Sequence, residues 1–183
     1  GVTRLASLMA GEVHISAVDR ALQKDAMAKG MKLSTSQMPA MQFQWQFGGT
    51  YFATPEKLDH KNPFLLREVR QAMNMAVNRQ AIAQNLLGGK TQPHRVMGFH
   101  PQLSTAIWPG IWNPDWDTRF EERCGYDPVK AKALLVQAGY PQGFAFTLYL
   151  YTLPGLPEMV DIGQAMALDF QAIGLQPKLV EME

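Results

Sequence analysis

The chain has 183 residues, of which 46% are apolar and 18% are charged, so it is long enough to bury a core and too apolar to stay disordered. Its 17 basic and 16 acidic side chains give a formal net charge of +1. The composition therefore shows no excess of positive charge of the kind that binds nucleic acid or an anionic membrane. The single cysteine, Cys124, excludes an internal disulfide and a cysteine-based zinc site, and no apolar run approaches the ~20 residues that span a bilayer.

The first forty residues predict two short helix-then-strand units. Leucines at helical spacing predict a helix that stops at Gly11, and the alternating residues 12–15 predict a strand. A second helix is expected over residues 19–29, followed by a short strand over 31–33. The beginning of the chain lacks an initiator methionine and the features of a signal peptide, so we expect an excised piece of a longer protein.

The clearest strand signal lies just before Gly48. Phe43, Trp45 and Phe47 share one face of an extended segment, and glutamines occupy the other face. A helix is then expected from about residue 66, with Asn78 as the N-cap of the next helix.

A long irregular segment separates these helices from the helices and strands at the end of the chain. Residues 90–126 show little periodicity and predict an irregular loop, in which Asp115 and Asp117 are expected to lie in a solvated turn. Asp127 and the proline after it predict the start of a helix, which residues 144–151 and 177–182 follow as strands with a helix between them. Helices that alternate with strands in this way indicate an α/β fold.

Several of these segments together resemble one protein family, the extracytoplasmic solute-binding proteins of ABC importers of the peptide, nickel and oligosaccharide type (family 5). Residues 5–15 resemble its "L-x-x-L-x-x-G-E-V-D-I" segment, with His14 in place of the usual aspartate. Residues 67–79 are similar to its "D-x-x-V-R-Q-A-x-x-x-A-I-D-R" helix pair. Residues 126–140 match its "Y-D-P-x-K-A-K-x-L-L-x-x-A-G-Y" signature, the most specific of the three, and Ile173-Gly174-Leu175 follows in the family's order.

The resemblance implies a periplasmic-binding-protein-like lobe of type II, cluster C, with a mixed sheet flanked by helices. Residues 1–40 would be a remnant of the first lobe that leads to the hinge, and 41–183 would be the second lobe, incomplete at its C-terminus. The implied function is capture of a solute outside the cytoplasmic membrane and its delivery to ABC permease subunits. The protein would be a monomer that needs no cofactor, binds no nucleic acid and catalyses no reaction, and it would be membrane-associated if the parent is a lipoprotein.

Two alternatives stay open beside this function: a nickel-type member that binds a metal or metal chelate, and an enzyme built on the same lobe. The four histidines show no metal-binding spacing, and the chain contains no nucleophile, phosphate-loop or dinucleotide motif. Arg70 lies off the apolar stripe of its helix, which favours a structural bond to a carbonyl or carboxylate over a ligand contact.

Aromatic and neutral polar side chains are the candidates for the ligand cleft. Tryptophans in irregular segments offer flat apolar walls, and open α/β sheets bind ligands at the carboxyl ends of their strands. The candidate ligand-binding residues are Gln44, Trp45, Gln46, Trp108, Trp112, Tyr149, Tyr151 and Thr152. The alternative is that the tryptophans cover the core of the lobe.

The ligand class follows from a departure from the family pattern. In dipeptide-binding relatives an arginine that pairs with the ligand carboxylate comes just after the strand at 144–151, whereas residues 153–157 contain none. This difference argues against a dipeptide with a free carboxylate and favours an uncharged or internally neutralised solute, such as an oligosaccharide or a longer peptide.

Overall fold

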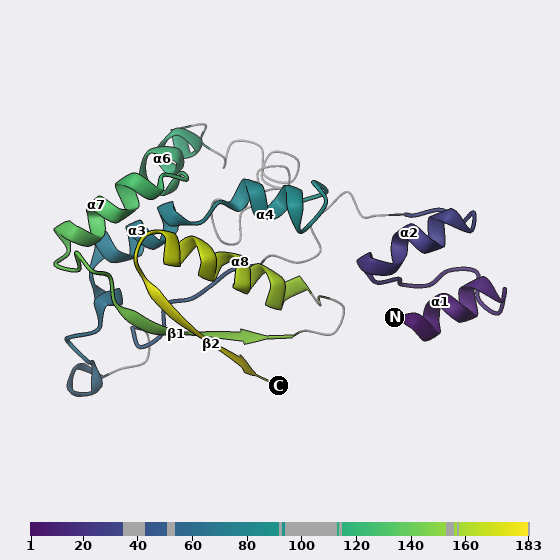
Figure 1. The fold of residues 1–183 in the computed structure, drawn as a ribbon, viewed down its shortest axis with the longest axis horizontal. Coiled ribbons are helices and arrows are strands. Elements are labelled where there is room, and N and C mark those ends of the chain that lie inside the picture. Colours follow the sequence, from purple (N-terminus) through teal and green to yellow (C-terminus); the bar gives the residue numbers. More distant parts are fainter. Residues whose placement is uncertain are drawn as a thin grey trace. The chain divides into compact units, whose positions relative to one another are not determined.

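A computed structural model describes residues 1–34, 43–50, 54–91, 93, 113, 115–152, 156 and 158–182. The chain divides into two compact units, Gly1–Ala40 and Met41–Glu183, each of which has its own internal contacts. Figure 1 shows the helices and strands of both units along the chain.

The first unit contains two short helices in contact with each other, α1 (Val2–Met9) and α2 (Arg20–Ala28). Gly11, at φ 73°, lies just beyond the end of α1 as expected, because a left-handed backbone there costs a glycine little. The strands expected at 12–15 and 31–33 are wrong, since the structure gives both segments an irregular backbone. A strand needs a neighbouring strand to complete its hydrogen bonds, and the described part of this unit offers none.

The second unit begins with an extended segment at residues 43–47. Phe43, Trp45 and Phe47 are half-buried against the core and the glutamines between them are exposed, which confirms the predicted alternation. The segment is not hydrogen-bonded as a strand among the residues that the structure describes. Two 3₁₀ turns follow, η1 (Pro55–Lys57) and η2 (Pro63–Leu65).

The next two helices match the predicted pair. Helix α3 (Arg67–Ala76) buries an apolar stripe, and α4 (Arg79–Asn85) begins at Asn78, whose Oδ1 accepts the backbone N–H of Ala81 at 2.9 Å. The backbone N–H of Asn78 donates to Asp169 at 2.9 Å, which ties the start of α4 to a later helix.

Residues 115–124 correct the prediction of an irregular loop over 90–126, because they form helix α6 (Asp115–Cys124). Asp115 and Asp117 lie in its first turn, where a negative charge stabilises the helix dipole, rather than in a solvated turn. The next helix, α7 (Pro128–Gln137), starts as predicted with the carboxylate of Asp127 accepting the Lys130 N–H at 2.8 Å.

The C-terminal part is a strand–helix–strand unit. Strands β1 (Ala145–Tyr151) and β2 (Gln176–Met182) pair in parallel, and α8 (Glu158–Ala172) connects them and packs on both. Figure 1 shows α8 running along one face of the pair. A Cβ on Gly163 would collide with the side chain of Leu150, so glycine permits this close approach.

The core of the second unit lies between α3, α7, α8 and the strands. Its members are buried apolar residues that α3, α7 and α8 contribute together with the turn before β2. The largest fully buried side chains are Phe170, Leu135, Met166, Ile173, Leu175, Val69 and Val77. These layers confirm the α/β class, and the described part of the sheet is a parallel pair.

Candidate functional site

A trough of about 560 Å³ opens in the second unit along the edge of β1. Residues 43–49 form one wall, β1 forms the other, and α8 with part of α3 forms the floor. We call this space the trough throughout. Its lining residues are Phe43, Gln44, Trp45, Gln46, Phe47, Gly48, Gly49, Asn62, Phe64, Met73, Phe146, Thr147, Leu148, Tyr149, Leu150, Tyr151, Met159, Gly163, Met166 and Phe170.

The floor of the trough is apolar and belongs to the core. The ring of Phe170 meets the ring of Phe146 at 5.7 Å and that of Trp45 at 6.2 Å between centroids, both edge to face. Such pairs add to the stabilisation that burial provides. The remaining floor residues are Gly163 and the buried methionines Met73, Met159 and Met166. Methionine side chains are flexible and adapt to irregular gaps, so this floor fits an apolar occupant.

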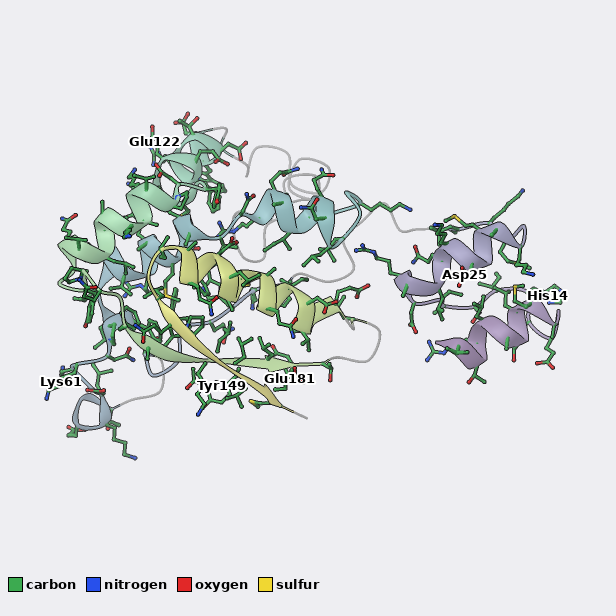
Figure 2. The ribbon with its side chains drawn as sticks, in the orientation of Figure 1. His14, Asp25, Lys61, Glu122, Tyr149 and Glu181 are labelled. Carbon is green, nitrogen blue, oxygen red and sulfur yellow. The ribbon has the colours of Figure 1, made fainter. Side chains whose placement is uncertain are left out.

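The rim of the trough is polar and aromatic, because alternate residues of an extended chain point to opposite faces. Gln44 and Gln46 are exposed on one wall, and Tyr149 and Tyr151 are 59% and 47% exposed on the other. Figure 2 shows Tyr149 on the side of the strand pair that faces away from α8. The two walls thus present hydrogen-bonding groups on the face opposite the apolar floor.

Five of the eight candidate residues line the trough: the Gln44–Trp45–Gln46 run, Tyr149 and Tyr151. Thr152 directly follows the carboxyl end of β1 and is exposed, but it is not part of the lining. Trp108 and Trp112 lie outside the described residues. The fold therefore brings together two segments that are about a hundred positions apart in the sequence, while their role in binding stays a prediction.

Arg79 holds Trp45 in place, a contact that the sequence analysis missed. Its guanidinium lies 5.2 Å from the centroid of the Trp45 ring and 5.8 Å from that of Phe120. It also donates to the backbone oxygen of Asn74 at 2.9 Å and to the Asn74 Oδ1 at 2.8 Å. Burial lowers the pKa of the Arg79 guanidinium from its usual value. Arg79 ends the helix-pair motif, but spacing along the chain does not reveal a contact with a residue 34 positions earlier.

Arg70 supports the other end of the trough wall. Its Nη1 donates to the backbone oxygens of Phe64 and Leu65 at 2.7 and 2.8 Å, so it binds carbonyls, as the structural interpretation predicted. Asn62 donates from Nδ2 to the Gly48 oxygen at 3.3 Å and accepts the Phe64 N–H at 3.0 Å. These bonds fix the turns that position Phe47 and Phe64, whose rings lie 5.4 Å apart.

Other chemistries have little support in the described part of the chain. No group of three or more His, Cys, Asp or Glu residues there is arranged to hold a metal ion. Burial raises the pKa of the Cys124 thiol, which disfavours the reactive thiolate. His94 and His100 lie outside the described residues. None of the helices that the structure describes has both the length and the apolar character needed to cross a membrane.

Comparison with known proteins identifies the family. The family model described as "Bacterial extracellular solute-binding proteins, family 5 Middle" matches residues 2–183. The chain belongs to this family. The resemblance of its three sequence segments to family 5 is thereby confirmed, and so is the fold class that the resemblance implied.

Several relatives show what members of family 5 bind. Di/tripeptide-binding protein 1 of Pseudomonas aeruginosa is 32% identical over 182 residues, which are 98% of this chain and 30% of that protein. The glutathione-binding protein GsiB of Shigella flexneri is 36% identical over 89 residues, 49% of this chain and 15% of that protein. The solved structure of the PBP AgaA from A. tumefaciens R10, in complex with agropinic acid, covers 66% of this chain and 22% of its own, with a TM-score of 0.51 and 26% identity. The chain thus spans less than a third of the length of these relatives.

Proposed function

We propose that residues 1–183 are part of a substrate-binding protein that captures a peptide-type solute outside the cytoplasmic membrane and delivers it to an ABC permease. Membership of a family described as extracellular and solute-binding supports this proposal. The two curated relatives reported above are named for the binding of di- and tripeptides and of glutathione. The function is therefore binding without chemistry, with the permease as the partner that accepts the solute.

The division into two units supports a two-lobed interpretation. Residues 1–40 would belong to the first lobe, and residues 41–183 would form the second lobe beyond the hinge. In open α/β sheets, ligands bind outside the carboxyl ends of the strands. In the second unit that end carries Tyr151 and Thr152, and β2 runs parallel to β1 toward the same end.

The observation that carries the proposal is the polar and aromatic rim of the trough. Gln44 and Gln46 supply amide donors and acceptors, and Tyr149 and Tyr151 supply flat rings with a hydroxyl group. Such groups suit the amides of a peptide backbone. Residues 153–157 contain no arginine to pair with a free carboxylate, so the α-carboxylate of the peptide would be held by other parts of the protein or be blocked.

Calorimetry on the intact protein tests this function. We expect binding of tripeptides, glutathione or longer peptides, and weaker binding of oligosaccharides and Ni²⁺. Tyr151→Ala should weaken peptide binding about tenfold, because truncation of an aromatic contact typically costs 1–2 kcal/mol. Tyr126→Ala is the matched control, since Tyr126 is equally exposed but lies outside the trough lining. Tight binding of an oligosaccharide or Ni²⁺ with no response to peptides would refute the proposed solute class.

A further inference from the structure

Arg79, the first residue of α4, is bonded to the C-terminal ends of two other helices. Its Nη1 donates to the backbone oxygen of Asn74, in the last turn of α3, at 2.9 Å and to that of Cys124, the last residue of α6, at 3.4 Å. Its Nη2 donates to the Asn74 Oδ1 at 2.8 Å. Backbone oxygens at a helix end lack a partner within the helix and carry the negative end of its dipole, so a guanidinium suits both ends. Helices α3 and α6 therefore fix the position of the Arg79 side chain.

The same guanidinium lies over two aromatic rings from different parts of the chain. Its Cζ is 5.2 Å from the ring centroid of Trp45 and 5.8 Å from that of Phe120 on α6, both within the ~6 Å of a cation–π contact. A guanidinium is planar, so its edge can donate hydrogen bonds while its faces stack on rings, which an ammonium group cannot do. Arg79 thus joins α6 to the extended segment at residues 43–47.

The position of Trp45 determines where the two glutamines beside it lie. The Trp45 ring meets the ring of Phe170 on α8 edge to face at 6.2 Å, and Arg79 covers it as well. Gln44 and Gln46 are its neighbours in the chain and are exposed on the opposite face of the extended segment. Successive Cα atoms are only about 3.8 Å apart, so a displacement of Trp45 carries both glutamine amides with it.

We propose that Arg79 is a positioning residue for solute binding: it joins α6 to the extended segment and thereby sets where Gln44 and Gln46 meet the solute. This inference rests on the proposed function, in which the glutamines contact the solute. Arg79 is half-buried and is not among the residues that line the trough, so it acts through Trp45 rather than by contact with the solute. A role in stability alone would leave the affinity of the folded protein unchanged, whereas a positioning role lowers it through the glutamines.

Calorimetry of the intact protein with tripeptides and glutathione tests the positioning role. Arg79→Lys should weaken binding about five- to tenfold, the equivalent of roughly one net hydrogen bond between a glutamine and the solute. In a protein that already carries Gln44→Ala and Gln46→Ala, the further change Arg79→Lys should alter the affinity less than about twofold, because the groups that it positions are absent. An affinity that Arg79→Lys leaves unchanged, or lowers equally with and without the glutamines, would overturn the proposal.

Asp127→Ala is the matched control for loss of stability. It removes the acceptor for the Lys130 N–H at the start of α7, and the loss of such a cap destabilises a protein without a change to Arg79 or Trp45. Urea denaturation should show a lower midpoint for both Asp127→Ala and Arg79→Lys, whereas only Arg79→Lys should weaken solute binding. Equal weakening of binding by both variants would reduce Arg79 to a structural residue and overturn the proposal.

Fluorine NMR of the intact protein labelled with 5-fluorotryptophan separates this proposal from the proposed function, because it needs no solute. The Trp45 signal is assigned by its loss in Trp45→Phe. Phe120→Leu should shift this signal, and the shift should be several-fold smaller when Arg79→Lys is also present, because Arg79 carries the link between the two rings. A signal that does not respond to Phe120→Leu, or responds equally in both backgrounds, would overturn the proposal. Tight binding of an oligosaccharide in place of peptides would refute the proposed solute class alone, and the Arg79→Lys comparison with that sugar would still decide the positioning role.

Discussion

Replacement of Phe170 by alanine tests whether the floor of the trough also holds the second unit together. Phe170 is 1% exposed, and its ring contacts the rings of Phe146 and Trp45 edge to face. Removal of a buried phenylalanine typically costs about 3–5 kcal/mol in lost burial and cavity formation, which includes part of the aromatic contacts. We therefore expect Phe170→Ala to lower the free energy of unfolding by about 4 kcal/mol, a large share of the 5–15 kcal/mol that folded domains have.

Urea denaturation followed by circular dichroism measures this loss. With a slope of about 2 kcal/mol per molar urea, the midpoint should fall by about 2 M. Leu168→Ala is the matched control on the same helix, because Leu168 is 67% exposed and its truncation should change stability by less than about 0.5 kcal/mol. A loss below 1 kcal/mol for Phe170→Ala, or an equal loss for both variants, would show that the aromatic cluster is not part of the stabilising core.

Three further outcomes follow from the contacts of the second unit. Arg79→Lys should lower stability by about 1–2 kcal/mol and shift tryptophan fluorescence to longer wavelength, because lysine cannot hold both Asn74 oxygens while it covers Trp45; an unchanged urea midpoint would contradict this. Burial raises the pKa of Asp169 above its usual 3.8, so the folded chain binds that proton more tightly than the unfolded chain and stability falls as pH rises through this range. Asp169→Asn should therefore remove this decrease from a stability–pH titration, whereas Asp161→Asn on the exposed side of α8 should leave it in place. Calorimetry should detect no submicromolar binding of peptide, sugar or nickel by residues 1–183 alone, because a two-lobed site then lacks half its contacts; such tight binding would contradict the proposed lobe assignment.

The helices of the second unit could be predicted from the sequence because their start signals are local. Asn78 and Asp127 each accept a backbone N–H of the first turn, and in both cases the donor lies three positions further along the chain. Gly139 and Gly174 end their helices with positive φ for the same local reason. The parallel pair β1–β2 was also predictable, since the helix between two apolar runs forces a crossover.

The incorrect predictions share a different cause. Residues 12–15 alternate as a strand does, but alternation does not show whether a partner strand exists. Helix α6 was missed because its apolar positions are few and its first turn carries Asp115 and Asp117, so it resembles a polar loop. In both cases the deciding contacts come from residues that are distant in the sequence.

The candidate site shows the same limit. The sequence placed Gln44, Gln46 and Tyr149 among the ligand-binding candidates by residue type and by position on a strand, and the trough brings all three together. The sequence did not show that residues 43–49 and β1 form opposite walls of one trough, nor that Arg79 covers Trp45. Residue type predicts which side chains suit a ligand, whereas only the packing of distant segments defines the space between them.

The alternation along residues 43–47 places core packing and the candidate ligand contacts on opposite faces of a single short segment. Trp45 packs down on Phe170 and under Arg79, so its ring contributes to the core. Gln44 and Gln46 point the other way and contribute little to the core, which leaves their amides available for a ligand. Under the proposed function, the glutamines could change with the solute while the aromatic residues stay fixed by packing. Specificity could then vary without loss of the fold, because the candidate ligand contacts and the core contacts lie on opposite faces of the same backbone.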